Sequence, residues 1–183
     1  MFSKFKKDIA KYKDYSNTNG LVLLLTQQGL WALFVYRISN SIYVSSMPSM
    51  LRRLLLIPCL ITQKSIEIIT GISLPYSAAI GERFYVGHFG GIIINANAVI
   101  GNNCNISQGV TIGVSGIKEK RGVPSIGNNV YIGANAVVVG KINIGDGAVI
   151  GANSLVTKDV VSNTTVLGVP AIKINDHNSS GYI

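Results

Sequence analysis

An aliphatic residue returns every six positions through most of the second half of this chain, and a glycine often follows it. The register runs through Leu74, Ile80 and Val86, skips two residues, resumes at Ile94, Ile100, Ile106 and Ile112, and continues after a longer break at Ile126, Ile132, Val138, Ile144, Ile150 and Val156. A period of six fits neither an amphipathic helix nor a simple strand alternation. It predicts a parallel β-helix, in which three short strands make one coil and each strand places one aliphatic side chain inside.

This pattern divides the chain into three parts, and the second of them contains a long loop. Gly71 marks the start of the predicted β-helix, which covers residues 71–174. The segment 114–125 is too polar to stack and is expected to leave the coil as a loop. Asparagine is frequent between the repeats, where tight corners need a left-handed backbone. Residues 175–183 are expected to form a flexible tail.

Residues 1–70 lack the repeat and are predicted to be helical. One apolar face is formed by Leu30, Trp31, Phe34, Val35, Ile38 and Ile42, and further apolar helical stretches lie on either side of Pro58. Two interpretations of this region remain open. It can be a cap that covers the first coil and joins subunits, which we favour because buried helices are the commoner case. It can also lie on a membrane surface with basic side chains near lipid phosphates, namely Arg37, Arg52, Arg53 and the N-terminal lysines.

The net charge of +8 is concentrated at the N-terminus, with lysines at positions 4, 6, 7, 11 and 13. No nucleic-acid-binding motif accompanies this charge, so we expect no nucleic-acid partner.

Cys59 and Cys104 have no metal-ligand spacing, which is typical of a reducing compartment. No secretory signal or membrane-spanning run is recognisable. We therefore expect a cytoplasmic protein, which includes a position at the inner face of the membrane.

His88 is the principal candidate for chemistry, because the other histidine, His177, lies in the expected tail. His88 follows Val86, where the register slips by two residues, and such a slip is expected to bend one corner outward. An imidazole there can serve as a general base near neutral pH. It can equally be a surface histidine at a turn, and the spacing alone does not choose between the two.

Residues 71–174 resemble the hexapeptide-repeat acyltransferases, and within them the serine acetyltransferase branch. The resemblance rests on the block Gly87-His88-Phe89-Gly90-Gly91, on Gln108-Gly109-Val110-Thr111-Ile112-Gly113, on the length of the 114–125 loop, and on the ending Gly168-Val169-Pro170-Ala171. It implies a left-handed parallel β-helix, a homotrimer, acetyl-CoA as the donor, no metal, and His88 as the general base. The left hand comes from the family alone, because parallel crossovers usually take the other hand.

The chain also departs from that branch. Acidic residues of the serine acetyltransferases are replaced by Ser73 and Gly87, and a loop arginine and histidine by Gly122 and Val123. These groups bind the charged ends of the amino acid, and sites that lose such partners discriminate strongly. The short apolar N-terminal region resembles that of exopolysaccharide and capsule O-acetyltransferases of the colanic-acid type. We therefore expect a sugar hydroxyl, free or lipid-linked, as the acceptor. The alternative enzyme is a serine or other amino-acid O-acetyltransferase with an altered acceptor site. The alternative without enzymatic activity is a trimeric scaffold.

The resemblance places the donor in a groove between two subunits, with direct transfer of the acetyl group to the acceptor. Small side chains would let the pantetheine arm approach, and a lysine would meet the CoA phosphates, so the candidates are Gly113, Ser115, Gly133, Ala134, Ala152 and Lys158. A backbone N–H near Gly113–Ser115 would stabilise the oxyanion. Basic residues of the loop, Lys118, Lys120 and Arg121, are further phosphate candidates. Two histidines are too few for a three-histidine zinc site.

Overall fold

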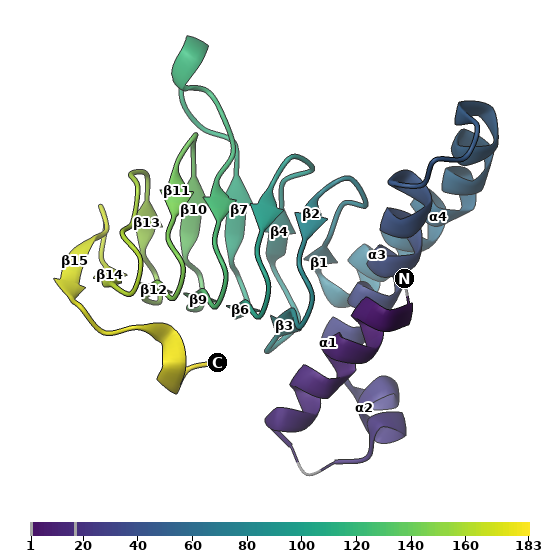
Figure 1. The fold of residues 1–183 in the computed structure, drawn as a ribbon, viewed down its shortest axis with the longest axis horizontal. Coiled ribbons are helices and arrows are strands. Elements are labelled where there is room, and N and C mark those ends of the chain that lie inside the picture. Colours follow the sequence, from purple (N-terminus) through teal and green to yellow (C-terminus); the bar gives the residue numbers. More distant parts are fainter. Residues whose placement is uncertain (1, 17) are drawn as a thin grey trace.

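The computed structural model describes residues 2–16 and 18–183, and it places a group of helices against one end of a β-helix (Figure 1). The helices are α1 (Phe2–Asp14), α2 (Gly20–Thr26), α3 (Gln28–Tyr43) and α4 (Ser49–Thr70). The apolar stretches expected on either side of Pro58 form one continuous helix, α4. None of the helices in the described ranges is by itself long and apolar enough to cross a bilayer, and only the pair α2 and α3, bent by 92°, passes that test together.

The β-helix is built from three sheets of short parallel strands, one strand of each sheet per coil. Sheet A contains β1 (Ile72–Ser73), β4 (Ile92–Ile94), β7 (Thr111–Gly113), β10 (Val137–Val139) and β13 (Leu155–Val156). Sheet B contains β2 (Ala79–Ile80), β5 (Val99–Ile100), β8 (Ser125–Ile126) and β11 (Asn143–Ile144). Sheet C contains β3 (Tyr85–Val86), β6 (Asn105–Ile106), β9 (Tyr131–Ile132), β12 (Val149–Ile150), β14 (Thr165–Leu167) and the antiparallel β15 (Ile172–Asn175).

The six-residue register is the core of this β-helix. Every aliphatic residue of the register from Leu74 to Val156 is buried, and residues two positions earlier, such as Phe84 and Val110, are buried as well. The two-residue slip is taken up between Val86 and Ile94, where the next coil resumes in register with Ile112. The expected left-handed parallel β-helix with an N-terminal helical region is confirmed.

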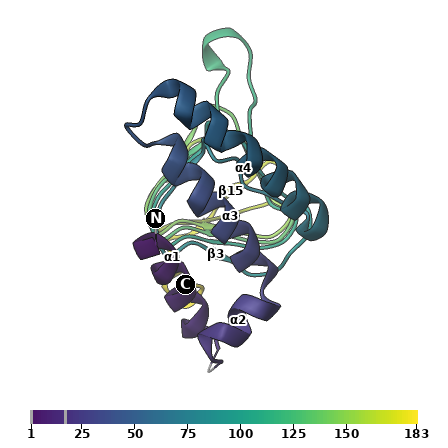
Figure 2. The same cartoon turned by 90° about the vertical axis from the view of Figure 1, so that its right-hand side faces the viewer.

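Seen end-on, the coils are triangular, and their corners align into three edges (Figure 2). We call these the C–A edge, the A–B edge and the B–C edge after the sheets that meet there. Asn103, Asn129 and Asn163 lie on the B–C edge with φ near +55°, and Asn135 and Asn153 do so on the C–A edge. Asparagine tolerates this left-handed conformation, which explains its frequency between the repeats. The 114–125 loop leaves the A–B edge and contains the short 3₁₀ helix η1 (Lys118–Lys120).

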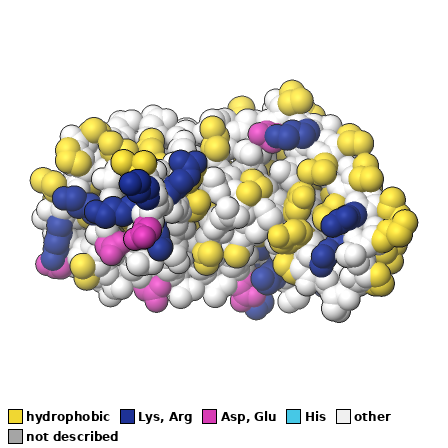
Figure 3. All heavy atoms as spheres, turned by 90° about the horizontal axis from the view of Figure 1, so that it is seen from above, with side chains coloured by type: hydrophobic (Ala, Val, Ile, Leu, Met, Phe, Trp, Pro, Cys, Tyr) yellow, Lys and Arg dark blue, Asp and Glu magenta, His cyan; other side chains and the backbone are white. Residues whose placement is uncertain are grey.

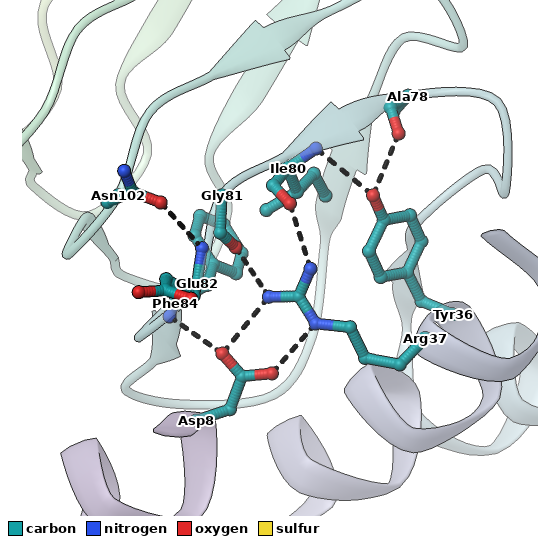
Figure 4. A network of polar contacts seen from close by, with 9 residues as sticks. All are labelled: Asp8, Tyr36, Arg37, Ala78, Ile80, Gly81, Glu82, Phe84 and Asn102. Carbon is teal, nitrogen blue, oxygen red and sulfur yellow. Dashed lines mark hydrogen bonds and ion pairs between the residues drawn. The ribbon is translucent and has the colours of Figure 1, made fainter. Parts of the chain in front are cut away.

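The helices seal the open end of the first coil, whose strands have no preceding coil to pair with. Arg37 Nη1 donates to Ile80 O at 2.8 Å, and the Tyr36 hydroxyl donates to Ala78 O at 2.8 Å (Figure 4). Asp8 accepts from Phe84 N at 3.0 Å and from Arg37 Nε at 2.8 Å. These side chains are buried, so the cap supplies the hydrogen bonds that another coil would otherwise make.

The cap corrects two expectations about the helices. The face of α3 that packs on the β-helix contains Leu30, Leu33, Tyr36 and Arg37, whereas Phe34 is exposed. Arg37, expected near lipid phosphates, is 2% exposed and paired with Asp8. Lys11, one of the N-terminal lysines expected near lipid phosphates, is also buried and donates to Asn103 Oδ1 at 2.8 Å. Arg37 donates to carbonyl oxygens of the open first coil, and Lys11 donates to a side-chain oxygen of the second coil.

The C-terminal segment, expected to be a flexible tail, instead packs against the outer surface of sheet C. It contains the 3₁₀ helix η2 (Ser179–Gly181). Ser179 is buried, and its amide donates to Gly147 O at 3.0 Å. The Tyr182 ring stacks on Tyr131 with centroids 4.7 Å apart. Aromatic contacts and backbone hydrogen bonds therefore offset the entropy that made a free tail the default expectation.

The three sheets differ in what covers their outer faces. Sheet C is covered by α1 at the first coil, where Tyr12 and Tyr15 contact Tyr85, and by the C-terminal segment farther along. Sheet B carries mostly small or polar outward side chains. Sheet A has an outward row of aliphatic side chains that are exposed or half-buried, namely Ile93, Val137, Val139 and Leu155. Sheet A is therefore the apolar outer face of the β-helix that residues 2–16 and 18–183 leave open.

Candidate active site

His88, Gly133, Ala134 and Ala152 lie along a single edge of the β-helix. His88 follows the sheet C strand of the first coil, Gly133 and Ala134 that of the third coil, and Ala152 that of the fourth coil. All four therefore lie on the C–A edge. The coils are tied together there by backbone hydrogen bonds, including Asn153 N to Ala134 O at 2.8 Å and Asn135 N to Gln108 O at 2.9 Å. The structure thus aligns these four predicted site residues.

The register slip positions the His88 side chain outside the coil. Gly90 and Gly91 have φ values of +97° and +67°, which side chains rarely adopt, and their turn takes up the two extra residues. Gly90 N donates to Thr70 O at 2.9 Å, which anchors the turn to the end of α4. The His88 side chain is exposed. Among residues 2–16 and 18–183, no hydrogen bond orients its imidazole, and Ser73, which replaces an acidic residue of the serine acetyltransferases, lies in β1 opposite Ile93.

A cavity of about 390 Å³ opens beside His88 between the β-helix and the helical cap. The β-helix contributes the segment Tyr85–Phe89, which includes His88. The cap contributes Tyr12, Tyr15 and Ser16 from the α1 side, and Leu23 and Thr26–Gly29 from α2 and the start of α3. Most of the polar groups lining it are neutral hydroxyls and amides. The imidazole therefore faces a space of small-molecule size whose wall offers neutral hydrogen-bonding groups.

The remaining predicted donor residues, Gly113, Ser115 and Lys158, lie on the A–B edge. Ser115 lies at the base of the loop, where its amide donates to Gly122 O at 3.1 Å. That N–H is engaged and does not serve as a free oxyanion donor in this arrangement. A cavity of about 460 Å³ beside the loop is lined by Ser115, Lys120 and Lys141. Within one protomer, the structure therefore separates these residues from His88 by a whole face of the coil.

Gly133 and Lys158 have surroundings that differ from those expected of residues that contact the donor. A Cβ on Gly133 would lie 2.7 Å from Ala152 N, so this glycine is required for the stacking of coils. Lys158 is exposed and lines a separate cavity of about 210 Å³ near the end of the β-helix, together with Lys173. Lys141, by contrast, faces the groove beside the loop and was not singled out from the sequence.

Cys104 does not provide a nucleophile for this site. It lies at the B–C edge, inside the coil, and is 1% exposed. Burial raises the pKa of its thiol to about 11, so the thiolate is disfavoured. Its Sγ contacts Gly127 O at 3.2 Å. The geometry therefore favours direct transfer over an acyl-cysteine intermediate.

Sequence reasoning missed the cap side of the cavity. Tyr15, Thr26, Gln27 and Gln28 line the space beside His88, although they are 60 or more positions away in the chain. The available signal was the polar group Thr26-Gln27-Gln28 in an otherwise apolar segment. That signal marks a break between helices, but it does not identify the part of the β-helix against which the break packs.

Known proteins resemble this chain over most of its length. Residues 124–158 match the bacterial transferase hexapeptide family (six repeats). A serine acetyltransferase of Synechococcus elongatus is 36% identical over 158 residues, covering 86% of this chain and 62% of the relative. A serine acetyltransferase of Bacillus pumilus is 34% identical over 171 residues, covering 92% of this chain and 75% of the relative. The chain thus spans 62% of the length of the first of these relatives and 75% of the length of the second.

Solved structures give the same result. Serine acetyltransferase of Brucella abortus strain S19 in complex with coenzyme A aligns with a TM-score of 0.84 at 27% identity, over 96% of this chain and 68% of the other. Serine acetyltransferase of Neisseria gonorrhoeae in complex with serine aligns with a TM-score of 0.80 at 31% identity, over 94% of this chain and 68% of the other. The likeness therefore includes the helical cap as well as the repeats.

These comparisons correct the expected acceptor. The prediction of a sugar hydroxyl, with kinship to exopolysaccharide O-acetyltransferases, is wrong, because relatives that cover most of the chain are serine acetyltransferases. Four substituted positions, Ser73, Gly87, Gly122 and Val123, were given more weight than the likeness of the whole chain. The expected class, an acetyl-CoA-dependent acyltransferase, is confirmed. The chain belongs to the serine acetyltransferase family of hexapeptide-repeat acyltransferases.

Proposed function

We propose that this protein transfers the acetyl group of acetyl-CoA to the hydroxyl of serine, or of a closely related amino acid, with His88 as the general base. The observation that carries the proposal is the exposed His88 imidazole at the mouth of the 390 Å³ cavity. The serine acetyltransferase relatives support the choice of acceptor. The Brucella abortus enzyme in complex with coenzyme A supports the choice of donor.

The proposed reaction needs one base and one thioester. The His88 imidazole takes the proton of the acceptor hydroxyl as its oxygen attacks the thioester carbonyl. The tetrahedral intermediate then collapses, the C–S bond breaks, and the CoA thiolate receives the proton from the imidazolium. No redox partner is needed. The exposed position of His88 suits this role, because donor and acceptor must both reach the ring from outside the coil.

The cap wall of the cavity is proposed to bind the acceptor. In place of the charged groups missing at Ser73, Gly87, Gly122 and Val123, it offers Tyr15, Thr26, Gln27 and Gln28. A glutamine amide can accept a hydrogen bond from an ammonium group or donate one to a carboxylate. Neutral groups bind a zwitterion less tightly than charged partners do, so we expect a high KM for serine and looser discrimination among hydroxy amino acids.

The complete site is proposed to require a homotrimer. The A–B edge carries Ser115, Lys120 and Lys141, whereas His88 lies on the C–A edge. If the apolar outer faces of sheet A meet around a threefold axis, the C–A edge of one copy lies beside the A–B edge of the next. The outward side chains of sheet A, including Ile93 at 54% exposure, support this packing because they are apolar and uncovered.

The test is release of CoA from acetyl-CoA with separate acceptors: L-serine, L-homoserine, L-threonine and water alone. The proposal predicts saturable release with L-serine or one of its two analogues, and an O-acetyl amino acid detected by mass spectrometry. CoA release that no hydroxy amino acid stimulates, in protein that binds acetyl-CoA, would refute the acceptor class. Loss of acetyl-CoA binding itself would refute the enzymatic function.

A further inference from the structure

Helix α4 presents an apolar face that nothing in the described part of the chain covers. Of its residues, Leu56, Cys59 and Thr70 are buried, toward the rest of the protein. On the opposite side, a row at helical spacing is exposed: Met50, Leu54, Ile57, Ile61 and Ile68. Ile61 and Ile68 are 65% and 83% exposed. Soluble surfaces rarely carry so continuous an aliphatic strip, so this strip indicates a binding surface.

The charges beside this strip are basic. Arg53 is exposed on the flank of the strip, whereas Arg52 is half-buried on the side of Leu56 and Cys59 and donates to Ser45 O. The acidic side chain in the helix, Glu67, is paired with Lys64 at 2.8 Å, so it does not neutralise the arginines. Figure 3 looks down on this end of the molecule at its right, where hydrophobic side chains surround two groups of Lys or Arg atoms. The surface therefore combines exposed aliphatic side chains with uncompensated positive charge.

We propose that α4 binds the surface of an anionic lipid bilayer, lying in the plane of the headgroups with Leu54, Ile57 and Ile61 in the acyl boundary. An amphipathic helix binds such a surface through its buried apolar area together with attraction between basic side chains and anionic lipid. Arg53, which is exposed on the flank of the strip, would meet lipid phosphates, which guanidinium groups bind in a bidentate manner. The inference does not depend on the proposed acceptor, because α4 lies outside the cavity beside His88.

A second copy of the chain fits this surface less well. Pairing two α4 strips would bring Arg53 of each copy against a face whose acidic side chain, Glu67, is already paired. Like charges brought together in a desolvated contact are unfavourable. An anionic bilayer supplies the opposite charge and an apolar layer at the same time, so it is the occupant that the charge pattern favours.

The test is sedimentation of the full-length protein with vesicles of phosphatidylcholine alone and of phosphatidylcholine mixed with phosphatidylglycerol. We expect binding to the mixed vesicles, weakening at high salt as the screening length falls from about 10 Å at 0.1 M to about 3 Å at 1 M. The double variant Leu54→Glu/Ile61→Glu should lower the bound fraction at least about tenfold. Val99→Glu/Val161→Glu is the control, because it adds the same charge at exposed aliphatic positions of the β-helix.

Three outcomes would overturn the proposal. The first is no sedimentation of the wild type with mixed vesicles. The second is an equal loss in both double variants, which would show a general effect of charge. The third is a smaller assembly by light scattering, without vesicles, for the α4 variant alone, which would show that a second copy covers the strip. Circular dichroism of both variants separates these outcomes from misfolding.

Discussion

Two groups of polar side chains lie where the helical cap meets the first coil, and they differ in how they are satisfied. In the first group, Asp8, Tyr36 and Arg37 are buried and bonded to one another or to the backbone of the coil (Figure 4). In the second group, His88 is exposed, and Gln27 and Gln28 line a 390 Å³ cavity. Both groups bridge the same two parts of the chain.

The difference indicates which polar residues hold the fold and which can act on a ligand. A buried polar group with complete partners has no free hydrogen-bonding capacity, and its removal is felt as lost stability. A polar group that lines an open cavity keeps its hydrogen-bonding capacity and can use it to bind a substrate. We therefore assign Asp8, Tyr36 and Arg37 to the structure, whereas His88 and the cap glutamines are the groups to which the proposed function gives catalysis and acceptor binding.

The largest effect is expected from Arg37→Ala, which should lower the free energy of unfolding by about 3–5 kcal/mol. Burial raises the pKa of the Asp8 carboxyl, and Arg37 opposes that rise, so removal of Arg37 leaves the carboxyl buried without its ion pair. Urea unfolding at a fixed protein concentration measures this change.

The matched control is Arg53→Ala, at an exposed position of α4, which should change stability by no more than about 0.5 kcal/mol. The double variant Asp8→Leu/Arg37→Met should recover part of the loss, because it leaves no unpaired buried charge. Equal stability of Arg37→Ala and Arg53→Ala would break the distinction between the two polar groups.

Cys104 provides a second way to sharpen the comparison, since it is a titratable group inside the sealed coil. Burial raises the pKa of its thiol to about 11, above the usual value of about 9. A raised pKa in the folded state means that its contribution to stability is present below pH 9 and is lost as the pH rises toward 11. The loss should reach about 2 kcal/mol at pH 11.

Unfolding measured from pH 8 to pH 11 tests this expectation, with Cys104→Ala as the comparison because it lacks the thiol. The slope between pH 9 and pH 11 should be smaller in the variant. The native thiol should also resist iodoacetamide at pH 8. Rapid alkylation of Cys104 in the folded protein would show that the coil is not sealed there.

The smallest effect concerns the acceptor side of the cavity. Gln28→Ala should raise KM for the amino-acid acceptor about tenfold with kcat nearly unchanged, because it removes a binding contact outside the reacting bonds. Gln63→Ala in α4 is the control, since Gln63 does not line the cavity. Steady-state kinetics measure both variants. A fall in kcat with unchanged KM would show that Gln28 acts in the catalytic step and would contradict its role in acceptor binding.

The β-helix could be predicted from the sequence because its core is local and periodic. Each aliphatic residue from Leu74 to Val156 fills the same position in its coil, so spacing alone determines what is buried. The cap could not be predicted in the same way. The roles of Tyr36 and Arg37 depend on unpaired carbonyls of Ala78 and Ile80, more than 40 positions away, which exist only once the coil has formed.

The candidate site shows the same limit. The outward position of His88 is predictable from the break in register, which is a feature of the local sequence, whereas its role as a base rests on the resemblance to the acyltransferases. Gly133 was assigned to a groove, yet the stacking of coils against Ala152 requires it, and glycine suits both purposes. The cap residues Thr26, Gln27 and Gln28 were missed since their position depends on how two helices pack on a distant strand. The acceptor was mispredicted because four substituted positions were weighed without the likeness of the whole chain to serine acetyltransferases.

The most direct test of the account is serine-dependent release of CoA by the wild type and by His88→Ala at equal concentration. The account predicts saturable release by the wild type and a decrease of at least about 100-fold in the variant, with unchanged melting temperature. His177→Ala, at an exposed position far along the chain, should retain full activity. Undiminished release by a folded His88→Ala protein would contradict the assignment of His88, and with it the division between structural and catalytic polar groups.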